Sequence, residues 1–531
     1  MIFSSLQYFL FLPIALLLYW KTRGVWRHFI VVATSYFFYM SWLPIYGVLM
    51  LALTTANWLL AQAIENSSPK MKKPLFILGL FINLGCLSYY KYTNFFISNA
   101  IALINSFVAS VSTSFGALGA HFTHSGSAIA TGQLLTDKAQ SLQGQILPTP
   151  VFDIILPLGI SFFVFEFVHY LIDVYRGDKS VKSWLEFAAF AAFFPSQIAG
   201  PIKRYQEFSQ YLHKPLPWSA DLFHNGMALL MRGLFKKVAL ADPLSLIVAA
   251  GFSNSATLSG LDAWISTFTF PILVYLDFSG YTDMGRGSAM LMGIKLPDNF
   301  MLPLLSADTG TLWRKWHMSL STWLRDYVYF PLGGSKKGFW SGLLNTMITM
   351  AVCGLWHGAA WTYILWGVTQ GVGVCINRIW MEYAGRINKN WTVKDKGLVF
   401  GQCNFFLYAV CFALTYLYTS ITWVFFRAAT LTEATNVISH LLAPGYTSIL
   451  LAPLAKSCLV AIMGCYVVFW LACEIARHQP QWIPSIFKSA MPEASKLLFS
   501  TPMRYASWTA AFVLILAARP TEAVPFMYFQ F

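Results

Sequence analysis

Long uncharged blocks of hydrophobic residues alternate with short polar turns along the chain. A helix needs about 20 apolar residues to cross a bilayer, and about 17 can suffice. Several blocks reach this length, at residues 3–20, 29–63, 74–90 and 457–473, and at 238–261 with Asp242 as their single interruption. The pattern predicts an all-α polytopic membrane protein with roughly ten to twelve transmembrane helices, plus re-entrant and interfacial helices.

Composition and charge agree with this pattern. Of the 531 residues, 57% are hydrophobic and only 11% are charged, whereas a soluble domain carries about 25% charged residues. The net charge of +14 is explained by Lys and Arg that stay on the cytoplasmic side and meet anionic membrane lipid. No separate basic domain exists for nucleic acid, so we expect membrane lipid and no nucleic acid as partners.

Basic clusters predict a topology. One cluster at residues 21–27 follows the first block, and a second at 70–73 follows the next. Both are expected to be cytoplasmic, with an outer turn at residues 41–44 and the N-terminus outside. The first basic residue, Lys21, follows the apolar block instead of preceding it, so we expect a retained membrane helix and no cleavable signal peptide.

Three segments depart from simple crossings. Residues 111–148 are rich in Ser, Gly, Thr and Ala and are interpreted as a polar extracytoplasmic linker without helix. Residues 184–199 have basic residues on both flanks and contain Pro195, which predicts a re-entrant element beside a cavity near Gln197. Residues 313–327, WRKWHMSLSTWLRDY, are aromatic and basic, and predict one amphipathic helix at the cytoplasmic interface.

Ionisable residues inside apolar sequence are costly, so each is a candidate for function. Glu166, His169 and Asp173 share one helix face, as a channel wall or, in the favoured interpretation, as a buried network between helices. Asp277 and Asp283 lie in DFSGYTDMGRG, where glycines allow close helix packing. For these two aspartates the functional and structural interpretations are equally supported.

The strongest candidate for chemistry is His317 with His357, 40 positions apart in the sequence. A neutral imidazole is the usual general base near neutral pH, and acyl transfer to a hydroxyl needs one. Gly354 and Gly358 flank His357 and allow a thioester or the backbone to approach closely. Taken alone, the residues favour a structural role for each histidine, as a hydrogen-bonded residue of the core, over a catalytic role.

Other catalytic or metal-binding patterns are missing from the sequence. It contains no H-E-x-x-H, G-x-S-x-G, P-loop or H-x4-D motif, so the chemistry of those motifs is not expected. The eight cysteines include no C-x-x-C and lie in apolar stretches, where free Cys acts as a small hydrophobe. We therefore expect no metal site and no disulfide framework.

Long motifs resemble the membrane-bound O-acyltransferase (MBOAT) family, in the bacterial polysaccharide branch that includes the alginate O-acetylation membrane protein. The resemblance runs from the opening MIFSS to about residue 375. It is carried by LPLGISFFVFEFVHYLIDVYRG, FFPSQIAGPIKRY, DFSGYTDM, LPDNF, WRKWHMSLSTWLRDYVYFPLGG and GLWHGAAWTYILWG. The C-terminal third is similar only in general character.

The resemblance implies one acyltransferase domain, residues 1–531, with helices around a central tunnel. Its parts are N-terminal helices at 1–110, the linker 111–148, a catalytic core at 149–380 and C-terminal helices at 381–531. It implies His357 as the general base and His317 as the partner that positions the donor. The other expected substrate-binding residues are Trp313, Arg314, Trp316, Trp323, Arg325, Asp326, Trp356, Gln197, Asp277 and Tyr281.

The resemblance also implies the reaction and its setting. An acetyl group would pass from cytoplasmic acetyl-CoA, the donor substrate, to an exported polysaccharide across a bacterial cytoplasmic (inner) membrane, with no tightly bound cofactor. A periplasmic SGNH-type partner and the polysaccharide machinery would complete the transfer. Basic side chains near His317 can attract the CoA phosphates, or can simply mark the cytoplasmic side: Arg314, Lys315, Arg325, Lys336 and Lys337.

The chain departs from the family pattern in two places. Glu166 stands where a neutral residue such as Gln is expected, and the linker 111–148 is longer than in this branch. Both concern the acceptor or partner rather than the type of reaction. Two alternatives stay open: a D-alanyl-type transferase that uses a carrier-protein thioester, and a transporter with a histidine proton relay, although no repeated halves are evident.

Overall fold

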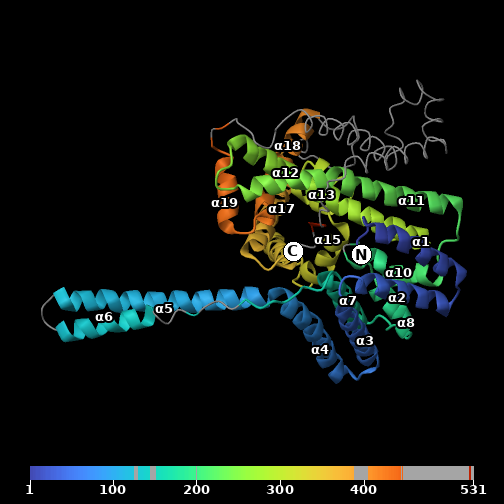
Figure 1. The fold of residues 1–531 in the computed structure, drawn as a ribbon, viewed down its shortest axis with the longest axis horizontal. Coiled ribbons are helices and arrows are strands. Elements are labelled where there is room, and N and C mark those ends of the chain that lie inside the picture. Colours follow the sequence, from blue (N-terminus) through green and yellow to red (C-terminus); the bar gives the residue numbers. More distant parts are fainter. Residues whose placement is uncertain are drawn as a thin grey trace. The chain divides into compact units, whose positions relative to one another are not determined.

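The computed structural model describes residues 1–124, 129–143, 147, 151–198, 200–387, 405–443, 445 and 526–527. Within these ranges the regular structure is helical (Figure 1), which confirms the predicted all-α class. The chain divides into two compact units, residues 80–157 and the remainder, which are described separately.

The larger unit begins with membrane-type helices. The uncharged block 29–63 splits at the predicted turn, since one helix ends at Met40 and the next begins at Pro44. Pro is well tolerated at the first position of a helix. The helices up to the unit boundary are α1 (Leu6–Lys21), α2 (Val25–Met40), α3 (Pro44–Asn66) and α4 (Pro69–Leu87), the last of which crosses that boundary.

The middle of the larger unit mixes one long helix with many short ones. The predicted block 238–261 is not a single crossing, because Asp242 and Pro243 start a separate helix that Asn254 caps. The elements are α7 (Ile160–Arg176), α8 (Trp184–Ala191), α9 (Phe194–Gln197), α10 (Tyr205–His213), α11 (Ala220–Leu234), η2 (Phe235–Ala241), α12 (Asp242–Ser253) and α13 (Gly260–Leu291). The short α8 and α9 fit the predicted re-entrant element.

The remaining elements of this unit carry the two candidate histidines. They are η3 (Pro303–Leu305), α14 (Thr309–Lys315), α15 (Met318–Leu324), η4 (Arg325–Tyr329), α16 (Phe339–His357), α17 (Trp361–Ile387), α18 (Phe405–Arg427) and α19 (Leu431–His440). The expected single helix over 313–327 is wrong, because the chain breaks at His317 between α14 and α15. The predicted block 457–473 lies outside the described residues.

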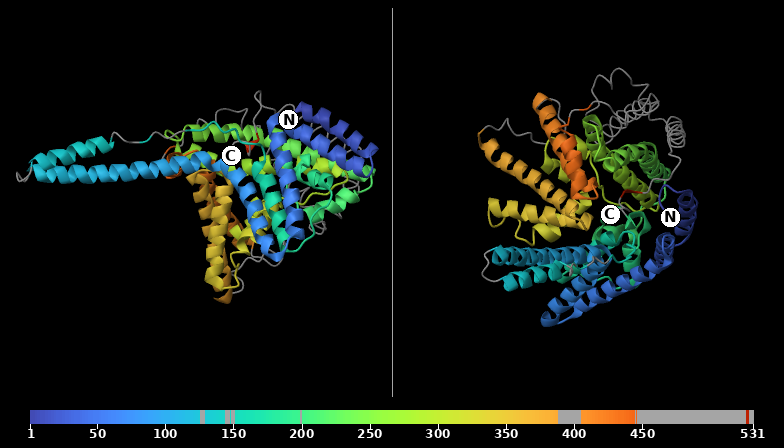
Figure 2. Two further views of the ribbon diagram at one scale, coloured as in Figure 1. Left: turned by 90° about the horizontal axis from the view of Figure 1, so that it is seen from below. Right: turned by 60° about the vertical axis from the view of Figure 1, so that its left-hand side comes forward.

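Glycines bring two helix pairs together. On α13, a Cβ added to Gly280 would lie 2.8 Å from the carbonyl oxygen of Gly233 on α11. On α16, a Cβ added to Gly354 would lie 3.0 Å from the Cα of Gly367 on α17. The two helices of each pair lie side by side, as Figures 1 and 2 show for α11 and α13. The prediction that the glycines of DFSGYTDMGRG allow close packing is therefore confirmed.

The smaller unit, residues 80–157, contains η1 (Ser88–Tyr92), α5 (Thr93–His124) and α6 (Ile129–Gln143). The expectation of a helix-free linker over 111–148 is wrong for most of that segment. Hydroxyl groups of α5 bond back to carbonyls one turn earlier, as Thr113 Oγ1 does to Ala109 O at 2.9 Å. Small residues also let the helices meet, since Ser112 Oγ donates to Ala139 O of α6 at 2.7 Å. Ser and Thr therefore support this helix pair by bonds that composition does not reveal.

Within the described residues, five segments are long and apolar enough to cross a membrane: Pro44–Asn66, Pro69–Leu118, Gly260–Leu291, Phe339–His357 and Phe406–Arg427. The protein is a multi-pass membrane protein.

Candidate active site

His357 is placed by the end of α16. The helix stops there because Gly358 takes an extended conformation, with φ −161° and ψ 150°. A side chain at Gly358 would collide with the ring of Tyr363, so that position requires glycine. His357 itself is 4% exposed, and its imidazole is held in the interior of the larger unit.

His317 is placed by a break in the chain. Its φ of 43° and ψ of 54° lie in the left-handed region, where a non-glycine residue costs about 1–3 kcal/mol. The residue is fully buried. It lies between α14 and α15, outside the candidate membrane-spanning helices. Burial lowers the pKa of His317 to about 3, so the ring is neutral at physiological pH.

The indole ring of Trp356 lies between the two histidines and contacts both imidazole rings. Its ring centroid is 6.2 Å from that of His317 and 4.8 Å from that of His357. The two imidazole centroids therefore lie within about 11 Å of each other, the sum of these distances. Residues 40 positions apart in the sequence thus meet in one aromatic cluster.

Further aromatic rings, from several helices, complete this cluster. Phe162 of α7 and Phe278 of α13 pack against His317, with ring centroids 6.3 and 4.8 Å away. Trp366 of α17 and Phe426 of α18 pack against His357 at 5.0 and 5.2 Å. Phe162, Phe278, Trp366 and Phe426 were not expected from the sequence, because an aromatic residue in an apolar helix gives no local sign of its partner.

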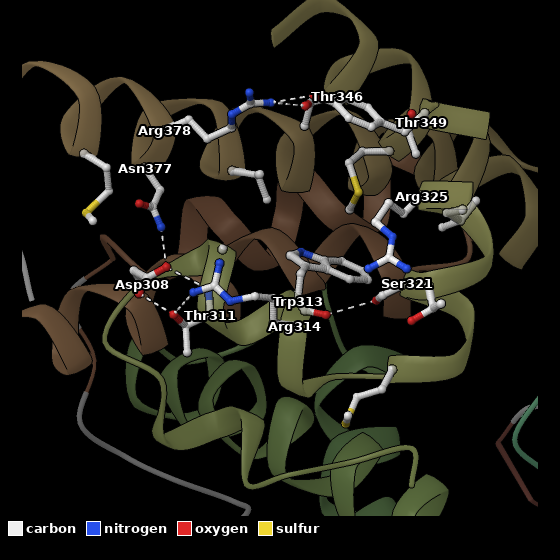
Figure 3. A pocket seen from close by; sticks show the side chains of 18 of the residues that line it. Asp308, Thr311, Trp313, Arg314, Ser321, Arg325, Thr346, Thr349, Asn377 and Arg378 are labelled. Carbon is white, nitrogen blue, oxygen red and sulfur yellow. Dashed lines mark hydrogen bonds between the residues drawn. The ribbon is translucent and has the colours of Figure 1, made fainter. Parts of the chain in front are cut away.

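A cavity of about 930 Å³ opens beside this cluster. Its wall comes from α14, α15, η4, α16 and α17 (Figure 3). Trp313 lines the cavity and touches Trp366, with ring centroids 5.8 Å apart. Met318, the residue after His317, also lines it. The cavity therefore lies next to both histidine-bearing segments.

Three arginines make the cavity electropositive: Arg314, Arg325 and Arg378. Arg378 is held by hydrogen bonds to Thr346 Oγ1 at 3.0 Å and Gly342 O at 3.2 Å. Arg314 donates to Thr311 Oγ1 at 2.5 Å. Two carboxylates, Asp308 and Glu382, also lie in the wall. The amide of Asn377 binds Asp308. Arg314 and Arg325 were expected from the sequence, but Arg378 was not, because it lies on α17 outside the histidine motifs.

Four other predicted substrate-binding residues have protein partners instead of a place in the cavity wall. Trp316 packs against Trp423, with ring centroids 4.8 Å apart. Trp323 stacks on Phe165 at 3.8 Å. Asp326 forms ion pairs with Arg325 and Arg204. Gln197 is buried, and its amide donates to Met50 Sδ at 3.3 Å.

Asp277 and Tyr281 contact the two ends of the chain. Asp277 pairs with Lys237 at 2.8 Å and accepts a hydrogen bond from the backbone N–H of Met527 at 2.9 Å. Tyr281 stacks on Phe3 and on Phe526, with centroids 4.5 and 4.2 Å away. The described C-terminal residues therefore reach the α13 segment that also carries Phe278, against which His317 packs.

Two of the three polar residues of α7, Glu166 and Asp173, bond to other segments, as the favoured interpretation predicted. Glu166 forms a buried ion pair with Lys203 at 2.7 Å. Asp173 accepts a hydrogen bond from Tyr327 Oη at 2.8 Å. His169 lies beside the ring of Tyr327, with centroids 5.7 Å apart.

The remaining candidate aspartate, Asp283, is also structural. It pairs with Arg232 and Lys236, each at 2.7 Å. Both partners come from the segment that packs along α13, so these ion pairs fix the contact between α11, η2 and α13.

Comparison with known proteins agrees with the motifs. Residues 90–419 match the model of the membrane-bound O-acyltransferase family. The chain is 33% identical to a "Probable alginate O-acetylase AlgI" of Pseudomonas putida, over 84% of this chain and 81% of the relative. It is 28% identical to a peptidoglycan O-acetyltransferase of Helicobacter pylori, over 85% and 81%. It is 31% identical to a teichoic acid D-alanyltransferase of Streptococcus thermophilus, over 44% and 59%.

Proposed function

The chain belongs to the membrane-bound O-acyltransferase family, and from this premise we propose that it moves an acetyl group from cytoplasmic acetyl-CoA toward an exported polysaccharide. The observation that carries the proposal is the joint placement of two buried histidines around Trp356, beside a cavity that contains three arginines. Acyl transfer needs a base, a bound donor and exclusion of water, and this arrangement can supply each.

The cavity fits the donor. Its volume of about 930 Å³ is within the range of roughly 300–1,000 Å³ that is typical of small-molecule and cofactor sites. Guanidinium groups bind phosphate oxygens well, and CoA carries several phosphates. Trp313 separates the cavity from Trp366 and His357. A donor whose phosphates lie near Arg314 and Arg325 can extend its thioester toward the histidines.

His357 is proposed as the general base. Its imidazole takes the proton of the acceptor hydroxyl while the oxygen attacks the thioester carbonyl carbon. The new C–O bond forms, the C–S bond breaks, and CoA leaves as a thiolate that receives the proton from the imidazolium of His357. No proton is gained or lost overall. His317 is proposed to position the donor.

The names of two relatives support a polysaccharide acceptor. Two of the relatives above are named as O-acetylating enzymes, for alginate and for peptidoglycan. We propose the bacterial cytoplasmic membrane as the location and a periplasmic SGNH-type protein as the partner that completes transfer to the sugar. The D-alanyl-type and transporter alternatives lack a comparable observation in their favour, and the match to the D-alanyltransferase covers less than half of the chain.

The test is turnover of labelled acetyl-CoA by the purified full-length protein in liposomes. We expect release of free CoA, and its loss in His357→Ala and His317→Ala at unchanged folding and insertion. His440→Ala is the matched control, because among the described residues the His440 ring forms its hydrogen bond within its own helix, with Asn436 O at 2.8 Å. Full activity in His357→Ala would contradict the proposal, and turnover of only a carrier-protein thioester would favour the D-alanyl alternative.

A further inference from the structure

Asn299, in the LPDNF motif, contacts His317 directly. It lies in the connection between α13 and η3, and none of its surface is exposed. Its Oδ1 is 3.2 Å from His317 Nδ1, 3.2 Å from Ser319 N and 2.9 Å from Ser319 Oγ. The proposed function assigns Asn299 no role.

These contacts settle which way the Asn299 amide points. The backbone N–H of Ser319 can only donate, so the atom that it meets must be the amide oxygen. Ser319 Oγ agrees, because it accepts from Ile202 N at 3.0 Å and so has its hydrogen free for Asn299. An amide oxygen cannot donate. The hydrogen between Asn299 and His317 must therefore sit on His317 Nδ1.

The tautomer of His317 follows from this. A neutral imidazole with its hydrogen on Nδ1 has its lone pair on Nε2. His317 Nε2 is buried, and no described residue forms a hydrogen bond with it. Buried polar atoms nearly always have a partner, and the rings of Phe162 and Phe278 beside His317 offer none. A substrate group that carries an N–H or O–H can supply this partner.

The backbone of Asn299 also supports the break at His317. Asn299 O accepts a hydrogen bond from Met318 N at 2.9 Å, and Met301 N donates to Lys315 O at 3.0 Å. These two bonds bracket His317 and hold it in its left-handed conformation. Asn299 thus contacts the ring of His317 and forms one of the two backbone bonds that bracket it.

We propose that Asn299 is a positioning residue that fixes the tautomer of His317, so that Nε2 faces the substrate as a hydrogen-bond acceptor. The inference rests on the proposed function. It also sharpens it, because a neutral Nε2 acceptor can hold an N–H or O–H group of a substrate but cannot stabilise an oxyanion, which needs a donor. No bond between heavy atoms forms or breaks in this contact.

The groups around His317 leave Asn299 as its polar partner. On α13 the neighbouring carboxylate, Asp277, is paired with Lys237. On α7 Glu166 is paired with Lys203. On α16 the titratable group is His357, on the other side of Trp356. A charge introduced at position 299 would therefore act on His317 more directly than any charge already present.

The test compares Asn299→Asp and Asn299→Leu in the full-length protein, with kcat and KM for acetyl-CoA measured across pH. In Asn299→Asp a carboxylate beside Nδ1–H favours the imidazolium and raises the pKa of His317. Activity then falls at a higher pH on the acidic side than in the wild type, because the protonated ring has no acceptor. In Asn299→Leu the tautomer is no longer fixed, so kcat/KM falls about tenfold to a hundredfold with no such shift.

The matched control is Asn345, a buried amide that donates to Gly334 O at 2.7 Å. Asn345→Asp should leave the acidic side of the pH profile in place. Wild-type kcat/KM and an unshifted profile in both Asn299 variants would overturn the inference. Absence of acetyl-CoA turnover in the wild type would overturn the proposed function instead, so the two failures can be told apart.

A second measurement needs no variant of Asn299. In the ¹⁵N-histidine-labelled wild-type protein, solid-state NMR should find His317 neutral with its hydrogen on Nδ1, the signal being assigned by its loss in His317→Gln. A hydrogen on Nε2 would overturn the inference, even if the Asn299 variants do not fold.

Discussion

The indole of Trp366 meets the imidazole of His357 edge to face, with ring centroids 5.0 Å apart and planes at 89°. Edge-to-face packing is a favourable arrangement of aromatic rings. Trp366 also contacts Trp313, in the wall of the arginine cavity. A continuous path of ring contacts therefore runs from the proposed donor site to the proposed base, and the orientation of His357 depends on packing from α17.

Replacing Trp366 should separate the role of its ring from that of its N–H group. Trp366 is 2% exposed, so Trp366→Ala should cost about 3–5 kcal/mol of stability and lower kcat by freeing His357. Trp366→Phe should keep most of both, because among the described residues Trp366 Nε1 has no hydrogen-bond partner. Thermal unfolding and CoA release measure the two effects. Equal damage in both variants would contradict this account.

Arg314 should contribute to donor affinity and not to the chemical step. Its described hydrogen bond is to Thr311, so its guanidinium can also reach a phosphate. Arg314→Gln should raise KM for acetyl-CoA about tenfold or more at nearly constant kcat, since a hydrogen bond to a charged group contributes about 1.5–3 kcal/mol. Arg23→Gln, in the exposed turn between α1 and α2, is the control. A change in kcat alone would place Arg314 outside the donor site.

The sequence was sufficient to predict the membrane class and to select the two histidines that the structure brings around Trp356, because both leave a local sign. The catalytic roles of the histidines and the re-entrant element stay predictions. Apolar length marks a span, and the motifs around His317 and His357 are long. The α5–α6 pair was missed because its Ser-rich composition is typical of linkers. The break at His317 was missed because a non-glycine residue rarely adopts a left-handed conformation.

Contacts between distant segments account for the rest. Asn299 and Arg378 reach the site from other segments, and no pattern near either residue shows which side chain it meets. Lys203 is similar, since the sequence shows it only as a basic residue beside the segment 184–199, whereas its side chain is 2% exposed and paired with Glu166. Such pairs become visible only when the packing of the helices is known.

The glycine contact between α11 and α13 should tolerate no side chain. A Cβ at Gly233 would collide with the carbonyl oxygen of Gly280, and backbone atoms cannot move aside without shifting a helix. Gly233→Ala should therefore lower the melting temperature and weaken the ion pairs of Asp283 along the same contact. Gly85→Ala, in α4, also replaces a helical glycine, but no atom lies within 4 Å of its added Cβ, so it controls for the change in backbone freedom. Equal melting temperatures for the wild type and Gly233→Ala would contradict the observed helix spacing.

Glu166 and Lys203 should stabilise the folded protein only when both members of the ion pair are present. Both side chains are almost completely buried, at 5% and 2% exposure, and lie 2.7 Å apart. Removing one partner of a buried pair leaves an uncompensated charge, which typically costs about 3–5 kcal/mol. Glu166→Gln and Lys203→Met should each lower the melting temperature strongly. The double variant Glu166→Met/Lys203→Met should recover much of the loss, because apolar groups of similar volume can replace a buried ion pair.

Lys182→Met is the control, since Lys182 pairs with Glu65 while its own side chain is 62% exposed, and exposed pairs contribute about 0–1 kcal/mol. Additive losses in the double variant would show that the two residues act independently, and the pair would then not be what fixes the connection between α9 and α10 against α7.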